Sequence, residues 1–432
     1  MRISKHALTH LFIVFAYISC IVSTYILVVY DTFSYLGFQI NPNINYIIVL
    51  LISLVVGSFS MLLPARIEKP SQLLLLFTYY FIYIPNTIMP YIALNKADDY
   101  WLGILSYFTL CFFLLILIVN IKFKTEIKIN FNVKNINYIL IGFILVMFLP
   151  VLLFYKPDLS NILNLVSLVD LYEWREDYRE KSKSVPIIVE YMFNWSAKVF
   201  VPILLIIGLF KSSIKFITLA FIFNLCLFVV SGHKSIFFSY FLILIFYFAL
   251  KKSNSSISLI FPFISLIFFS CLIFFIFNDT TLLSIFVRRM IHIPGMLSGF
   301  YYEFFLENGY SKYSYNILKN ITYTNYSQTP PYLIGDYYFS KDGINANTGY
   351  LTLAYAEYGF LGGICIVLIV GALYKFIDNL VEYSKSQKNF LILLFIIPTW
   401  ALINGAFLTV FITHGFLITL IFIIFLKDKF VR

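Results

Sequence analysis

Charged residues are scarce in this chain. They make up 12% of its 432 residues, against about 25% in an ordinary soluble domain, whereas hydrophobic residues make up 61%. Residues 104–119 and 257–277 contain no charge at all, and about 20 apolar residues suffice for a helix to cross a membrane. These runs also lack the alternation of polar and apolar residues that is typical of outer-membrane barrels. The composition excludes a soluble protein and predicts several membrane-spanning helices.

Metal-binding motifs are also missing. The cysteines show neither CxxC nor CxxxC spacing, and the chain has no Asp-x-Asp motif and no cluster of His and Cys. We therefore expect no metal and no cofactor. The five cysteines fall within apolar stretches and are expected to be packing residues: Cys20, Cys111, Cys226, Cys271 and Cys365.

The apolar stretches predict an all-α, polytopic membrane protein with about twelve transmembrane helices, forming a single integral membrane domain over residues 1–432. The first stretch is too long for the apolar core of a signal peptide, so we expect it to remain as an anchor. The expected spans are residues 8–30, 46–64, 71–94, 100–120, 137–155, 191–210, 216–230, 236–250, 257–277, 349–374, 389–403 and 407–426.

The positions of the basic residues predict the orientation. If the N-terminus is cytoplasmic, eighteen of the 31 Lys and Arg residues fall on that face, and the four short connections opposite hold only Lys96 and Lys234. Both termini are then cytoplasmic, and two long loops, residues 156–190 and 278–347, lie outside. The net charge of +10 thus indicates contact with membrane lipids, and we expect no nucleic-acid partner. No internal repeat of the kind found in many transporters is evident.

Two cationic positions do not fit a simple apolar span. Lys198 lies about eight residues inside the span expected to begin near Tyr191, which indicates a wet cavity or a bound anion. The alternative is a later helix start, with the lysine reaching back to the interface. The turn of residues 231–235, with His233 and Lys234, joins two spans of only about fifteen apolar residues and is expected to be a recessed anion site or, equally, an ordinary exposed loop. We expect His414 to be a hydrogen-bonded core residue.

The two long loops carry the remaining candidate anion ligands. Arg175 and Arg179 are four residues apart on one predicted helix face, where they could grip a phosphate or pair with neighbouring acids. Arg288, Arg289 and His292 lie within about one helical turn, and no acid occurs between them and Glu303. Arginine forks suit a diphosphate, so we favour a lipid-linked diphosphate over general contact with lipid headgroups.

Tyrosines are dense after these arginines, with eleven in residues 301–350. A tyrosine ring offers an apolar face and a hydroxyl, which suits a sugar ring but also suits a membrane interface. We expect Tyr301, Tyr302, Tyr337 and Tyr338 to bind substrate within a folded outer cap over residues 278–347.

These features resemble the O-antigen polymerase family (Wzy-type), which is related to O-antigen ligases and to GT-C-like membrane glycosyltransferases. Arg288 is followed after ten residues by Gly299, similar to the Arg-x10-Gly pattern of such polymerases. The segment NTGYLTLAYAEYGFLG, residues 347–362, resembles the helix entry after their large loop. The segment departs from the family where many relatives carry an acid, because this chain has Thr352 there and Glu357 one turn later.

The resemblance implies an enzyme of the bacterial inner membrane that works without a metal on the periplasmic face. It would transfer a growing glycan from a polyprenyl diphosphate to a new lipid-linked repeat unit, giving O-antigen or capsular polysaccharide. A chain-length regulator and a flippase are further partners that the family suggests. The alternatives are a lipid-linked oligosaccharide flippase and an O-antigen ligase; a metal-dependent GT-C enzyme fits less well, because Asp31 stands alone in the first outer loop.

Each candidate residue then has an expected role. Arg288 and Arg289, with Lys198 and Lys234, are expected to hold the diphosphate of the donor. The acceptor hydroxyl needs a proton acceptor, for which three candidates stay open: His233, His292 and Glu303.

Overall fold

The computed structural model describes residues 5–122, 136–156, 168–315, 321–322, 326–339, 343–380 and 385–426. Within these ranges the chain is all-helical, and the only β-bridge found joins Arg66 to Ser255. Residues 123–135 and the start of the first long loop, residues 157–167, lie outside the described residues.

Eight helices of the described part are long and apolar enough to cross a membrane. The chain is therefore a polytopic membrane protein, as the apolar runs predicted. Five of the eight are single helices or nearly so: α6 (Asp98–Asn120), α11 (Ile214–Ser231), α12 (Lys234–Lys252), α13 (Ser256–Phe277) and α16 (Tyr350–Asn379). The other three combine several elements. They are His6–Thr32, which begins one residue into α1 (Lys5–Thr24); Pro70–Ala93, made of α4 (Pro70–Thr78), η4 (Tyr79–Tyr83) and α5 (Ile84–Ala93); and Ile187–Phe210, made of α9 (Ile187–Trp195), η6 (Ser196–Phe200) and α10 (Val201–Phe210).

Three further expected spans correspond to shorter apolar helical stretches: Tyr46–Leu62, which contains α3 (Tyr46–Ser58); Ile141–Tyr155, within α7 (Ile136–Tyr155); and Lys388–Ile403, within α17 (Lys385–Ile403). The last expected span, residues 407–426, is broken into α18 (Phe407–Ile412) and α19 (Phe416–Leu426). The break occurs at Gly415, whose φ of +81° is left-handed, and a Cβ there would lie 2.2 Å from Cγ2 of Val199. A glycine is needed at this position both for the backbone turn and for the close contact with η6.

The spans around the turn of residues 231–235 are longer than expected. α11 has 18 residues and α12 has 19, about 27–28 Å of helix each, because the helices continue through their terminal lysines. Each helix is thus longer than its run of about fifteen apolar residues, and a recessed position of this turn stays a prediction. Gly232 ends α11 with φ +63°.

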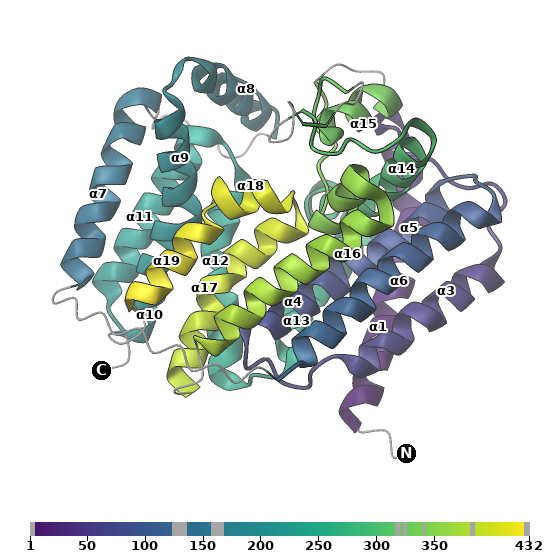
Figure 1. The fold of residues 1–432 in the computed structure, drawn as a ribbon, viewed down its shortest axis with the longest axis horizontal. Coiled ribbons are helices and arrows are strands. Elements are labelled where there is room, and N and C mark those ends of the chain that lie inside the picture. Colours follow the sequence, from purple (N-terminus) through teal and green to yellow (C-terminus); the bar gives the residue numbers. More distant parts are fainter. Residues whose placement is uncertain are drawn as a thin grey trace.

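The long loops contain helices that lie on one side of the bundle (Figure 1). Figure 1 shows α8 (Leu168–Ser184) and α15 (Pro330–Phe339) on the upper side, whereas α1 begins on the lower side. We call the side that carries α8 and α15 the outer side. Between α13 and α15 come η7 (Leu283–His292), a π-helix, and α14 (Ile293–Asn308), which is largely buried against α5 and α16. Much of residues 278–347 is thus packed into the bundle.

Candidate anion-binding site

Helix α8 is docked on the turn between α11 and α12. The guanidinium Nε of Arg175 donates a hydrogen bond to the carbonyl oxygen of Gly232 at 3.0 Å. One turn later, the buried ring of Tyr178 packs edge-on against the ring of His233, with 5.5 Å between their centroids. These two contacts bring the arginines of α8 to the polar turn.

Four cations from three elements act electrostatically on His233. Burial, followed by the positive charges of Arg175, Lys198, Arg179 and Arg289, lowers the pKa of His233 to about 4. The imidazole is therefore neutral at pH 7. Lys234 also lies near Arg175 and Arg289. We call Arg175, Arg179, Lys198, Lys234 and Arg289 the cation cluster.

Four of the five side chains of the cation cluster lack an ion-pair partner among the described residues. The ion pairs of Lys96 with Glu303 and of Lys375 with Asp378 involve none of these four. In the described part of the chain, no carboxylate lies within ion-pair distance of Arg179, Lys198, Lys234 or Arg289. Several like charges near one another repel unless an anion joins them, so this arrangement favours binding of a polyvalent anion.

Lys198 lies well inside its span. The helix begins at Ile187, earlier than expected, so Lys198 is eleven residues or about 16 Å along it, within the π-helical turn η6. Two polar atoms in the same region, Oγ of Ser196 and Nδ1 of His414, are buried without a hydrogen-bond partner among the described residues. His414 is near enough to feel the charge of Lys198. Unpartnered buried polar atoms beside a lysine indicate room for a polar ligand or water.

The two adjacent arginines of η7 contact different partners. Arg289 faces the cation cluster, whereas the guanidinium of Arg288 stacks over the ring of Phe33, 4.4 Å from its centroid, and bonds Oγ of Ser284 at 2.6 and 3.1 Å. Successive residues of a helix point in different directions, which separates these two side chains. The structure therefore differs from the expectation that both arginines bind one diphosphate, because Arg288 contacts Phe33 and Ser284 instead.

Two of the three candidate proton acceptors lie away from the cluster. His292 is fully buried, its Nε2 lies 3.1 Å from the carbonyl oxygen of Ile21, and its ring packs against Tyr25. Glu303 forms an ion pair with Lys96 on the α5–α6 side of the bundle. Burial and pairing leave neither side chain free to take a proton at the cation cluster, so the structure brings only His233 there.

Three of the four candidate tyrosines, Tyr301, Tyr302 and Tyr338, pack against other residues of the fold. Tyr301 is fully buried and donates to the carbonyl oxygen of Ala346 at 3.1 Å. Tyr302 stacks on Tyr355, and Tyr338 stacks on Phe300 with 4.1 Å between the ring centroids. Tyr337 is 61% exposed and is absent from the lining of the pocket described next.

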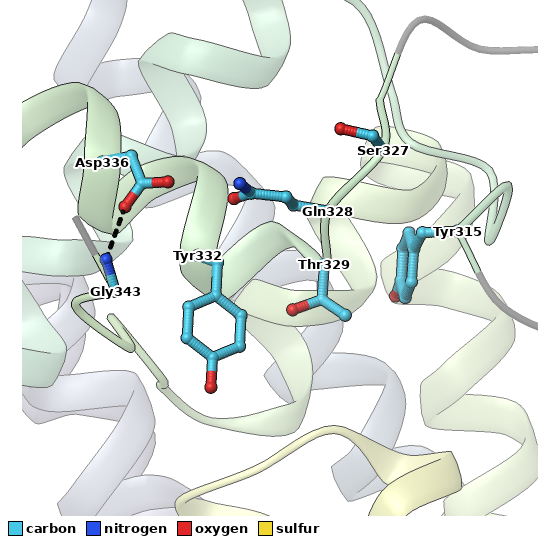
Figure 2. A pocket seen from close by; sticks show the side chains of 7 residues that line it. All are labelled: Tyr315, Ser327, Gln328, Thr329, Tyr332, Asp336 and Gly343. Carbon is cyan, nitrogen blue, oxygen red and sulfur yellow. Dashed lines mark hydrogen bonds between the residues drawn. The ribbon is translucent and has the colours of Figure 1, made fainter.

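A pocket of about 540 Å³ opens beside the N-terminus of α15 (Figure 2). Its residues come from three segments that are separate in the sequence, so no single stretch of sequence predicts it. Five side chains supply most of its lining: Tyr315, Gln328, Thr329, Tyr332 and Asp336.

Glu357 has a structural part that the sequence analysis did not predict. It is buried where α16 kinks at Tyr358 and Gly359. Its carboxylate accepts hydrogen bonds from Oγ of Ser311 and the backbone N–H of Tyr313, both at 2.7 Å, and from the hydroxyl of Tyr315 at 2.5 Å. Glu357 thus fixes the segment that leads to the pocket.

Among the residues that the structure describes, no group of three or more His, Cys, Asp or Glu side chains is placed to hold a metal ion. Comparison of the chain with protein-family models, with curated proteins and with solved structures gives no match.

Proposed function

We propose that this chain is a membrane glycosyltransferase that polymerises oligosaccharide repeat units carried on a polyprenyl diphosphate. The observation that carries the proposal is the cation cluster, which gathers basic side chains from α8, η6, α12 and η7 around a neutral histidine. A diphosphate offers several oxygens and at least two negative charges, which matches a site with several donors. Four of these donors, Arg179, Lys198, Lys234 and Arg289, have no carboxylate of a described residue within ion-pair distance.

The membrane position of Lys198 supports a bound anion. A lysine at the centre of a span costs about 2.5–3.5 kcal/mol on insertion scales. The neighbours of Lys198, Ala197 and Val199, are both buried. A bound anion or water would offset the cost of placing the lysine between them.

A lipid-linked substrate is supported by an apolar groove of about 930 Å³ between α1 and α13. Leu27, Phe268 and Phe275 are among its lining residues. Helix η7, which carries Arg289, packs against both of these helices. An isoprenoid tail in this groove would therefore lie next to the helix that contributes to the cation cluster.

The proposed reaction needs no group beyond those of the chain and its two substrates. The oxygen of the acceptor hydroxyl attacks the anomeric carbon of the donor, the bond from that carbon to the diphosphate oxygen breaks, and the diphosphate leaves with the electron pair. The cation cluster would stabilise the charge that develops on the leaving group. His233 is neutral and would accept the hydroxyl proton, and the bound diphosphate would raise its pKa from about 4 and so make it a better base.

Matched lysine variants test this function in cells that lack their own polymerase. Lys234→Gln removes a charge of the cluster, and Lys312→Gln removes an exposed charge elsewhere on the outer side. We expect Lys234→Gln and Arg289→Ala to abolish the long-chain glycan ladder while single-repeat material remains, and Lys312→Gln to give a normal ladder. Loss of all surface glycan would instead support a flippase or a ligase, and normal ladders in both cluster variants would refute the anion site.

A further inference from the structure

The pocket beside α15 has the side-chain chemistry of a sugar-binding site. Figure 2 shows the ring of Tyr332 and the amide of Gln328 between Asp336 on one side and Tyr315 on the other. Aromatic rings pack against the C–H faces of sugars, while amide, hydroxyl and carboxylate groups exchange hydrogen bonds with sugar hydroxyls. Its volume of about 540 Å³ falls within the range of about 300–1,000 Å³ found for small-molecule sites.

The walls of the pocket are held in place before any ligand binds. The hydroxyl of Tyr315 donates to Glu357, which leaves the ring of Tyr315 to face the pocket. Oδ1 of Asp336 accepts the backbone N–H of Gly343 at 3.2 Å, the bond drawn in Figure 2. Gly335 lies so close to Ile344 that an added Cβ would be 1.9 Å from its carbonyl oxygen. A pocket that is already ordered loses little conformational entropy on binding.

Several polar groups of the pocket are left for a ligand. Among the described residues, no hydrogen bond is formed by the amide of Gln328 or the hydroxyl of Tyr332, and Oδ2 of Asp336 is also open. Figure 2 shows the side chain of Gln328 directed toward Asp336, with no hydrogen bond between them. Three such groups around two tyrosine rings can recognise several hydroxyls of one sugar.

The charge of the pocket differs from that of the cation cluster. Its described lining residues include the carboxylate of Asp336 and no Lys, Arg or His. A carboxylate attracts hydroxyl donors but repels anionic groups, so an acidic sugar would be disfavoured there.

We propose that this pocket binds an uncharged oligosaccharide segment of the glycan. The inference deepens the proposed function, on which it rests for the lipid that carries the glycan. The cation cluster would hold the diphosphate end, and the pocket would select the sugar by its hydroxyls and its lack of charge.

Binding of free sugar to the purified full-length protein in detergent tests the pocket directly. The probes are neutral oligosaccharides released by mild acid from the surface glycan of the producing cells, and the readout is saturation-transfer NMR from protein to sugar protons. We expect transfer to the sugar ring protons, reduced at least fivefold by Tyr332→Ala and by Gln328→Ala. Tyr337→Ala is the matched control, because this tyrosine is on the same helix, is exposed and is outside the lining, and should leave the transfer unchanged. Absence of transfer to the native protein at millimolar sugar, or equal transfer to all three variants, would overturn the proposal.

A second comparison tests the selection by charge. Oxidation of the primary hydroxyls of the same oligosaccharides to carboxylates should weaken their binding to the native protein about tenfold, and Asp336→Asn should remove this difference. An unchanged preference in Asp336→Asn would contradict selection by this carboxylate. The sugar-binding and ladder experiments together separate this inference from the proposed function. Normal sugar binding to the native protein, with intact ladders in Lys234→Gln and Arg289→Ala, would refute only the anion site.

Discussion

Replacing Lys198 by methionine should stabilise the folded protein and abolish its activity at the same time. The side chain lies well inside a span, between buried neighbours, and no carboxylate of a described residue pairs with it. Methionine keeps the length of the side chain and removes the charge. On insertion scales a lysine at mid-span costs about 2.5–3.5 kcal/mol, and partial hydration of the site reduces this cost, so we expect a gain of about 1–3 kcal/mol in the free energy of unfolding.

The assay compares unfolding of the native protein and Lys198→Met in detergent, with and without pyrophosphate. A ligand present at about 100 times its Kd stabilises a protein by about 2.7 kcal/mol, so pyrophosphate should shift the unfolding midpoint of the native protein and have little effect on the variant. The glycan ladder of cells carrying the variant should be lost. Lys252→Met, at the exposed end of α12, is the control and should change neither stability nor the response to pyrophosphate.

Two results would refute this reasoning. If Lys198→Met were less stable than the native protein, the lysine would make favourable contacts within the fold and would not need a bound anion to offset its cost. If pyrophosphate stabilised Lys198→Met as strongly as the native protein, the anion would bind elsewhere.

Two further predictions concern His233 and Glu357. The pKa of His233 falls from 6.5 in the unfolded chain to about 4 in the fold, so the contribution of His233 to stability is complete above pH 6.5 and is lost as the pH falls toward 4. His233→Gln should therefore lose less stability than the native protein on acidification. The measurement is the unfolding midpoint between pH 7 and pH 4. Glu357→Gln should weaken three charge-assisted hydrogen bonds, lower the free energy of unfolding by about 1.5–3 kcal/mol and speed proteolysis near residues 309–315, with the exposed Glu307→Gln as control.

The same measurements can contradict both predictions. Equal loss of stability on acidification in His233→Gln and in the native protein would show that His233 is not the group that titrates. Equal protease resistance in Glu357→Gln and Glu307→Gln would show that the bonds at the kink of α16 do not hold the segment.

The apolar runs predicted most of the helices, because a span in lipid must satisfy its backbone within itself and must be long and uncharged. They did not predict the break at Gly415 or the burial of α14. The first depends on close contact with Val199, and the second on packing against α5 and α16. Both depend on tertiary contacts, which cannot be predicted from the sequence of one segment.

The basic residues of the site could be predicted from the sequence, since a charge in or near a span is costly unless it meets an anion, another polar group or water. Their directions were not predictable, because the rotation of η7 within the bundle decides that Arg289 faces the cluster while Arg288 stacks on Phe33. Tyrosine density pointed to residues 301–350, but Tyr301 and Tyr302 pack inside, and the open pocket is lined by Tyr315 and Tyr332. Which tyrosines face inward depends on helix packing that periodicity in an irregular segment does not show.

The contacts of α18 and Gly415 with α9 and η6 have a consequence for how the protein is made. Trp195, the last residue of α9, donates its indole N–H to the carbonyl oxygen of Ile412, a residue 217 positions later in the chain. During synthesis, η6 therefore enters the bilayer long before α18 and α19, which pack against this part of the fold, are made. During that interval Lys198 meets lipid, water or the insertion machinery without its final neighbours, so the newborn chain is most vulnerable to degradation until its last two helices arrive.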